Sequence, residues 1–133
     1  MEIREIIDGN TRLAIHIRGD WEEGLSFFSK EADFQQVGTW SYNKGKKLLS
    51  HRHIETKREI NRTQEVLFVR EGKVKAEIYN TADKLFKTLF VGKNDILILL
   101  AGGHGYEVLE DDTKVLEIKN GPYLGPENDR IRI

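Results

Sequence analysis

The sequence predicts a single all-β domain, built as a sandwich or a barrel. Its 133 residues are the length of one ordinary domain. Twelve glycines stand against two prolines, a balance that suits short strands joined by tight turns. Short apolar or alternating segments recur along the chain with turn residues between them, as in sandwiches and barrels. The predicted strands are 12–18, 37–42, 47–54, 65–69, 74–79, 85–91, 96–100, 106–109 and 115–119.

The first predicted strand, 12–18, alternates between apolar and polar positions. Leu13, Ile15 and Ile17 share one face, so the pattern predicts a strand with one buried side. His16 lies on the other face, where we expect it at the surface or behind the ligands of a site. Residues 26–36 fit a helical turn or a loop equally well.

The middle of the chain predicts strands separated by one charged loop. Residues 55–64 have no apolar period of their own and predict an exposed loop. In the strand that follows, Glu65 shares a face with Leu67 and Val69. Gly72 then marks a turn, and the next strand, 74–79, places its apolar residues on one face.

The last third of the chain contains the most apolar strand. Residues 96–100 are all apolar, which predicts burial on both faces. The turn signal at 92–95 precedes this strand, and Gly102 and Gly103 break it before the chain resumes at 106–109. A turn at 110–112 leads to the strand 115–119, and the remaining residues predict an irregular tail.

Composition excludes several kinds of protein. The chain has no cysteine, so thiolate metal sites, disulfides and thiol nucleophiles are excluded. Its 21 basic and 22 acidic residues give a net charge of −1, which does not favour nucleic-acid binding. The N-terminus lacks an apolar signal core, and the longest apolar run, 96–101, is too short to cross a bilayer. We therefore expect a cytoplasmic protein with a small-molecule ligand and neither a membrane nor a nucleic acid as partner.

Three histidines and one glutamate form the pattern that carries chemistry. On a strand, His51 and His53 would point to the same side. An isolated pair of this kind is more often exposed on an edge strand. Glu65, however, shares its face with apolar side chains, and a buried carboxylate needs a partner. His104 follows the glycine break, and imidazole with carboxylate suits zinc, iron, manganese or nickel. We expect one divalent metal ion held by these four side chains.

Two segments resemble the motifs of the cupin superfamily. In the first, Gly45 is followed after five residues by the His51-x-His53 pair, and Glu65 precedes Gly72 by six residues. In the second, Gly92, the strand 96–100, Gly102 and His104 come in the family's order. The chain departs from the pattern at Leu100, where proline is usual, and in the eleven residues between His53 and Glu65, where the usual gap is much shorter.

The resemblance implies a cupin jelly-roll barrel, also called a double-stranded β-helix. The whole chain, 1–133, would be one cupin domain, with a core at about 37–119 and an N-terminal strand extension at 1–36. His51, His53, Glu65 and His104 match the family's metal ligands. The long gap leaves Glu59 as a rival carboxylate, but Glu65 has the correct spacing to Gly72 and begins a strand.

Other residues are candidates for a substrate pocket. Tyr106 lies two residues from His104, and these two are the candidates for a catalytic group. Lys119 and Tyr123 flank a segment that resembles one in small cupins of surface-polysaccharide and sugar-nucleotide pathways. Arg62, like Arg58, could reach an anionic substrate from the charged loop, although such residues more often form a solvated rim. Trp21 and Trp40 are expected in the core or in an interface.

These features predict a metal-binding cupin that acts on a small polar metabolite, as a sugar or sugar-nucleotide isomerase or epimerase. Three alternatives remain open: a non-catalytic metal-dependent binding module, a metal-free sugar-nucleotide ketoisomerase and an iron-dependent oxygenase. The resemblance also implies a homodimer, because barrels of this kind often pair through edge strands.

Overall fold

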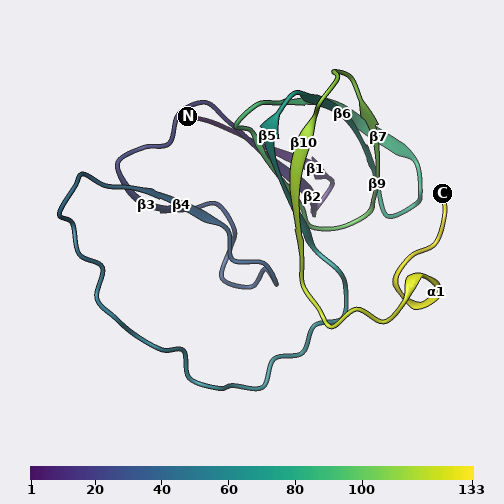
Figure 1. Cartoon of the computed structure of the whole chain (residues 1–133). Coiled ribbons are helices and arrows are strands. Elements are labelled where there is room, and N and C mark those ends of the chain that lie inside the picture. The colour runs from purple at the N-terminus through teal and green to yellow at the C-terminus, as the bar shows by residue number, and fades with distance from the viewer.

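The computed structural model describes residues 1–133 and consists of antiparallel strands with one short helix (Figure 1). The all-β prediction is confirmed. The elements are β1 (Glu2–Asp8), β2 (Thr11–Arg18), β3 (Gly24–Phe27), β4 (Gly38–Ser41), β5 (Glu65–Glu71), β6 (Lys73–Tyr79), β7 (Leu85–Gly92), β8 (Ile96–Leu99), β9 (Gly103–Val108), β10 (Lys114–Lys119) and α1 (Pro126–Asp129).

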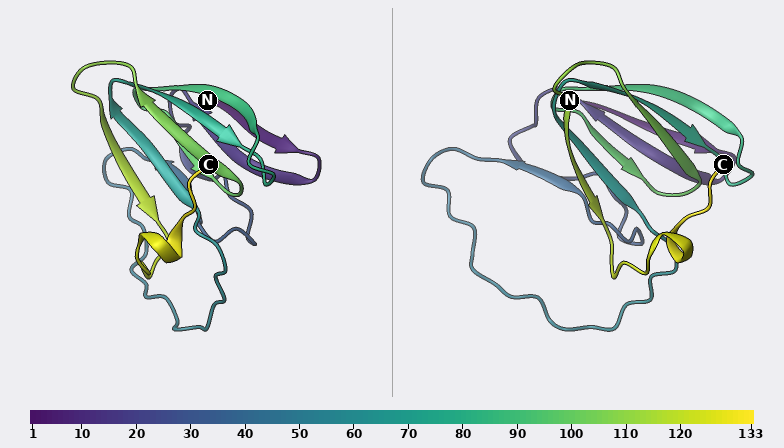
Figure 2. Two further views of the ribbon diagram at one scale, coloured as in Figure 1. Left: turned by 90° about the vertical axis from the view of Figure 1, so that its right-hand side faces the viewer. Right: turned by 45° about the vertical axis from the view of Figure 1, so that its right-hand side comes forward.

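Two sheets face each other and a separate hairpin lies outside them (Figure 2). The larger sheet has the strand order β1-β2-β8-β5-β10, and the smaller has the order β7-β6-β9. Strands β3 and β4 pair only with each other. No hydrogen-bonded ladder joins β10 to β9 or β1 to β7, so the two sheets form an open sandwich and do not close a barrel.

The core lies on both sides of the larger sheet. One cluster fills the space between the sheets and includes Leu67, Val69, Ile78 and Leu97. A second cluster lies on the outer face of the larger sheet, where β2, β5 and β8 contribute side chains. Every residue of β8 is buried, which confirms the prediction that this strand is covered on both faces.

Strand β2 differs from its prediction, because both of its faces are buried. Ile15 and Ile17 belong to the outer cluster, whereas Ala14 on the opposite face belongs to the cluster between the sheets. The expectation of a surface His16 is therefore wrong. His16 is only 3% exposed, and its Nε2 lies 2.9 Å from Oδ2 of Asp95. The carboxylate supplies the polar partner that a buried imidazole requires.

Several strand boundaries also differ from the predictions. The predicted strand 47–54 is absent; residues 42–64 run as one long loop away from the sheets (Figures 1 and 2). Strands β1 and β3 were not predicted, and the tail contains α1. Trp21 and Trp40 are exposed, so their expected place in the core is wrong, and an interface remains a prediction. No helix has the length and apolar character needed to span a membrane.

Candidate functional site

The candidate site lies where the edge strands of the two sheets, β10 and β9, leave the sandwich open. Glu65 begins β5 on the inward face, together with Leu67 and Val69, as the alternation predicts. It pairs with Leu99 of β8 on one side and with Lys119 of β10 on the other. The Glu65 residue is only 4% exposed. The sheet thus holds a carboxylate at the end of an apolar interior.

Three side chains from β9 and β10 surround this carboxylate. The Tyr106 hydroxyl donates to Glu65 Oε1 across 3.2 Å. His104 Nε2 lies 3.4 Å from Glu65 Oε2, and Lys119 Nζ lies 3.7 Å from the same oxygen. The ring centroids of His104 and Tyr106 are 5.1 Å apart. His104 and Tyr106, which are two positions apart on β9, therefore reach the same carboxylate, as period-two alternation requires.

Burial and neighbouring charge set the protonation states of two of these groups. Desolvation, followed by the charge of Glu65, raises the pKa of the Tyr106 hydroxyl well above its usual range. Tyr106 is therefore a permanent hydrogen-bond donor at neutral pH. The hydrogen bond to Glu117, 2.8 Å from Nζ to Oε1, is the main cause that raises the pKa of Lys119. Lys119 accordingly stays charged beside Glu65.

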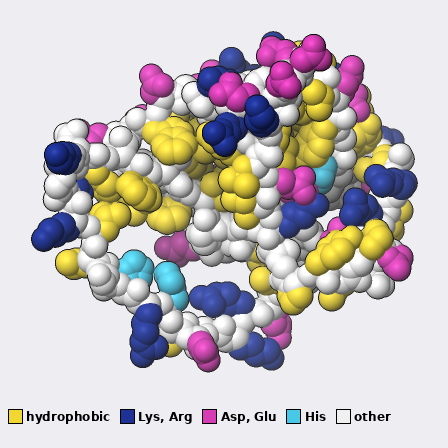
Figure 3. Space-filling model, viewed as in Figure 1, with side chains coloured by type: hydrophobic (Ala, Val, Ile, Leu, Met, Phe, Trp, Pro, Cys, Tyr) yellow, Lys and Arg dark blue, Asp and Glu magenta, His cyan; other side chains and the backbone are white.

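The two remaining predicted ligands lie on the long loop. His51 and His53 have ring centroids 5.2 Å apart, and His51 Nδ1 lies 3.0 Å from the Leu49 carbonyl oxygen. Both are exposed, and nowhere do three His, Asp or Glu side chains gather as a metal-binding group. The structure therefore divides the predicted ligands into two pairs, His51 with His53 and Glu65 with His104. Figure 3 shows open space between the loop and the body of the molecule.

The loop is fastened at the end that precedes Glu65. The Gln64 amide nitrogen donates to Asn120 Oδ1 across 2.7 Å, and Asn120 Nδ2 donates to the Arg62 carbonyl oxygen across 3.2 Å. Between 42 and 63 the only backbone hydrogen bond joins the Lys46 amide to the Asn43 carbonyl. Glu59 is exposed in this loop, with Lys57 Nζ 3.6 Å away. Of the two rival carboxylates, Glu65 is the one that contacts His104.

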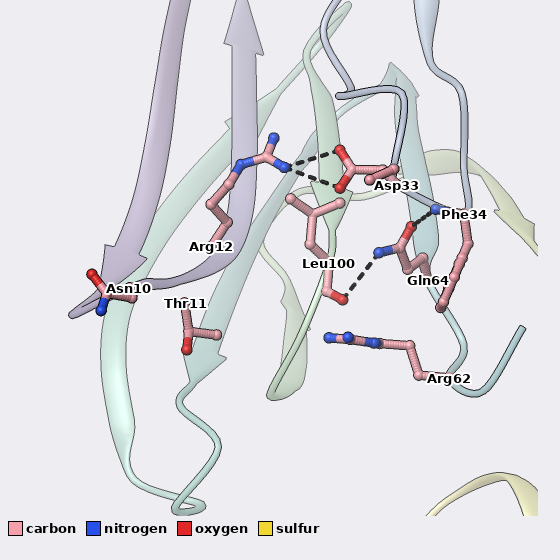
Figure 4. Close-up of a pocket in the computed structure, with 9 residues that line it drawn as sticks. Asn10, Thr11, Arg12, Asp33, Phe34, Arg62, Gln64 and Leu100 are labelled. Atoms are coloured by element: carbon pink, nitrogen blue, oxygen red, sulfur yellow. Dashed lines mark hydrogen bonds and ion pairs between the residues drawn. The ribbon is translucent and has the colours of Figure 1, made fainter.

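Arg62 lines a different pocket, of about 350 Å³, on the other side of Gln64 (Figure 4). Its guanidinium lies 5.8 Å from the centre of the Phe34 ring. In the same pocket Arg12 Nη1 donates to both carboxylate oxygens of Asp33, each at 3.0 Å. This ion pair ties the segment between β3 and β4 to β2, and its long sequence separation hid it from pattern analysis.

Tyr123 lies in the exposed tail, where its hydroxyl accepts a hydrogen bond from Arg130 Nη2 across 3.4 Å. The structure therefore joins only two of the four pocket candidates, Tyr106 and Lys119, to Glu65. Glu117 was missed as part of this group. Alternation along β10 could have found it, because Glu117 and Lys119 are two residues apart and face the same way.

No family model, curated protein or solved structure matches the chain. The chemistry of the site must therefore be argued from these contacts. An imidazole, a phenol and an ammonium group converge on one buried carboxylate. Such a set can exchange protons with a polar ligand, and its oxygen and nitrogen donors suit a divalent metal ion.

Proposed function

We propose that this protein is a metal-binding cupin whose open sandwich is the jelly-roll domain, and that its site acts on a small polar metabolite. The observation that carries the proposal is the burial of Glu65 beside His104. A carboxylate removed from water requires strong compensation. Its three donors lie at 3.2 to 3.7 Å, longer than the 2.7 to 2.9 Å typical of charge-assisted hydrogen bonds. The carboxylate thus has capacity for a stronger partner.

The proposed metal ion would be held by Glu65 and His104 together with His51 and His53. The two imidazoles of the loop already lie next to each other, which is how a pair of ligands must be arranged. Eleven residues lie between His53 and Glu65, and the twelve residue steps from one to the other span about 40 Å in an extended chain. The loop is therefore long enough to carry both histidines to the opening. Loops of this length without regular structure are uncommon in compact domains, and those that occur are usually either functional or disordered segments.

A bound metal ion would polarise a carbonyl or hydroxyl of the ligand, and this chemistry suits isomerisation or epimerisation of a sugar or sugar nucleotide. The chain's own groups would supply the remaining functions. Tyr106 is held as a proton donor, and Lys119 places a positive charge at the mouth for an anionic group of the ligand. His104 is the one imidazole already next to the buried carboxylate.

Metal content and a matched pair of carboxylate variants test the proposal. We expect the purified protein to bind about one divalent ion per chain in elemental analysis, and that ion to raise the melting temperature. Glu65→Gln should abolish this binding, whereas Glu59→Gln, the control in the exposed loop, should leave it unchanged. His51→Ala and His53→Ala should weaken binding without altering the circular dichroism of the metal-free protein. No binding of zinc, iron, manganese or nickel by the folded protein would overturn the proposal.

One observation favours a second candidate, a metal-free sugar-nucleotide ketoisomerase. His104 Nε2 lies against the Glu65 carboxylate in the arrangement that orients a general base. In that function His104 would move the proton and Tyr106 would donate to the ligand. Turnover of a sugar nucleotide that survives exhaustive chelation but is lost in His104→Ala would favour this candidate over the metal-dependent one.

A further inference from the structure

The hairpin formed by β3 and β4 has its apolar face turned toward solvent. Its inner face packs against the outer core cluster of the larger sheet through Phe28 and Val37, and the small polar Thr39 is buried on the same side. In contrast, Leu25 and Trp40 pair directly across the two strands and are 56% and 57% exposed. In most surface hairpins the large apolar side chains face the core and polar side chains face water, whereas here large apolar side chains also face water.

Two aromatic side chains extend the outward apolar face. Phe27 is 59% exposed, and its ring lies close to Gly38, the residue opposite it in the hairpin. The rings of Trp40 and Tyr42 are stacked with centroids 6.0 Å apart. No charged side chain interrupts the outward positions of the two strands. We call Leu25, Phe27, Trp40 and Tyr42 the hairpin patch.

The same side of the larger sheet carries two more exposed apolar side chains. Leu116 and Ile118 of β10 pair with Phe68 and Val66, which belong to or pack on the outer cluster. Figure 3 shows apolar side chains gathered over the hairpin and beside β10 on the face toward the viewer. Exposed apolar surface of this extent on one side marks an interaction site.

We propose that the hairpin patch, with Leu116 and Ile118 beside it, is the surface through which two copies of this chain form a symmetric dimer. The two strands place no charged side chain on this face, although the Lys46 ammonium lies 5.2 Å from the centre of the Tyr42 ring at the edge of the patch. A face with so little charge can meet its own copy without strong like-charge repulsion, as a two-fold interface requires. Leu25, Phe27, Trp40 and Leu116 are each more than half exposed, Ile118 is 46% exposed and Tyr42 is partly buried. At about 100 Å² of exposed surface for each side chain on average, the six offer roughly 600 Å² per chain. Stable interfaces bury ~800 Å² per partner, which flanking atoms can complete.

The isolation of the hairpin supports a second copy as the occupant. A two-stranded hairpin is marginally stable unless a face packs against something larger. Here the inner face is already covered by the same chain, and the face that remains is the more apolar one. A partner's identical patch would bury both outward faces at once and stabilise both hairpins.

Analytical ultracentrifugation of the full chain tests this inference with a matched control. We expect the wild-type protein to sediment as a dimer at micromolar concentration. Leu25→Glu and Trp40→Glu should each raise the dimer dissociation constant by about 100-fold, because a two-fold interface contains each substitution twice and each copy costs about tenfold. Leu85→Glu introduces the same charge at a side chain that is 54% exposed on β7, and this control should remain dimeric.

Two results would overturn the inference. One is a wild-type protein that stays monomeric at about 100 μM, a concentration at which even a weak specific dimer assembles. The other is a dimer that neither Leu25→Glu nor Trp40→Glu weakens while both variants keep the wild-type circular dichroism spectrum. No proposed metal ligand belongs to the patch, so failure of the dimer can be distinguished from failure of metal binding when both are measured on the chelated protein.

Discussion

Replacing Glu65 by leucine, alone and together with Tyr106→Phe, separates a functional carboxylate from a structural one. Glu65 is 4% exposed and lies beside Leu67 and Val69. If the carboxylate serves binding or catalysis, its burial lowers the stability of the fold, and its contacts with Tyr106, His104 and Lys119 are not needed for folding. An apolar side chain of similar size should then be tolerated, and the site should lose its metal and its activity.

The expected magnitude follows from the partners of the carboxylate. Exchanging a buried ion pair for well-packed apolar side chains is neutral or stabilising by about 1 to 4 kcal/mol. Glu65→Leu replaces only the carboxylate, but the partners left behind are not stranded: His104 and Lys119 are each about a third exposed to water, and Lys119 keeps its ion pair with Glu117. The lower end of the range therefore applies, about 1 kcal/mol. Glu65→Leu alone leaves the Tyr106 hydroxyl without its acceptor, which costs about 1 kcal/mol or more. The single variant should therefore be close to wild type, and the double variant about 1 kcal/mol more stable.

Urea unfolding of the chelated proteins at pH 7, followed by circular dichroism, measures these differences. Leu67→Ala, on the same face of β5, is the control for ordinary core damage and should lose about 2 to 5 kcal/mol. A double variant that is less stable than wild type by more than about 2 kcal/mol would refute the reasoning. It would mean that the Glu65 contacts hold the two sheets together and that the residue is structural.

Three further predictions concern other parts of the molecule. Asp95→Ala should lower the free energy of unfolding by about 3 kcal/mol in the same urea titration, because it leaves buried His16 unpaired and removes the acceptor of the Gly92 amide. The control is Arg18→Ala, which removes a long, half-exposed ion pair to Asp95 and should change the free energy of unfolding by less than about 0.5 kcal/mol. The raised pKa of Tyr106 means that the folded protein retains a proton that the unfolded chain releases near pH 10. The contribution of Tyr106 to stability is therefore complete below that pH and is lost progressively above it. The urea midpoint of the wild-type protein should fall more steeply than that of Tyr106→Phe between about pH 9 and about pH 11. Trypsin should cut first in the exposed loop 42–63, which includes Arg58, and a saturating divalent metal ion should slow this cleavage at least tenfold. An equal cleavage rate with and without metal would show that the loop does not close over the site.

The strands that were predicted well are those whose own side chains define both faces. The uniform apolarity of 96–100 requires burial on both sides, and the alternation after Glu65 assigns its inward face without knowledge of the partner strands. The alternation in β2 separates Ile15 and Ile17 from Ala14 correctly, but Leu13 was assigned to the wrong face, because it lies in the cluster between the sheets together with Ala14. The alternation also cannot say what covers each face. His16 was misplaced for that reason, since its partner Asp95 is 79 residues away in the sequence.

The candidate site was predicted in two parts, and the structure joins them only in part. Glu65, His104 and Tyr106 meet because regular alternation places each on the inward face of a paired strand. The prediction for 47–54 failed because a strand needs a neighbouring strand to satisfy its backbone groups, and the sequence does not specify one. The pairing of His51 with His53 still holds in the loop, whereas their approach to Glu65 remains a proposal.

The loop that carries His51 and His53 follows the hairpin directly, since β4 ends at Ser41 and the loop begins at the next residue. Its far end is already fastened through Gln64 and Asn120. A partner chain that covers Trp40 and Tyr42 would fasten its beginning as well. A loop held at both ends has less conformational entropy to lose when it closes, so dimerisation would strengthen metal binding. By linkage, the metal would then strengthen the dimer by the same factor. The two proposals therefore share one measurable quantity, the coupling free energy between the metal site and the interface, although each of them can fail alone.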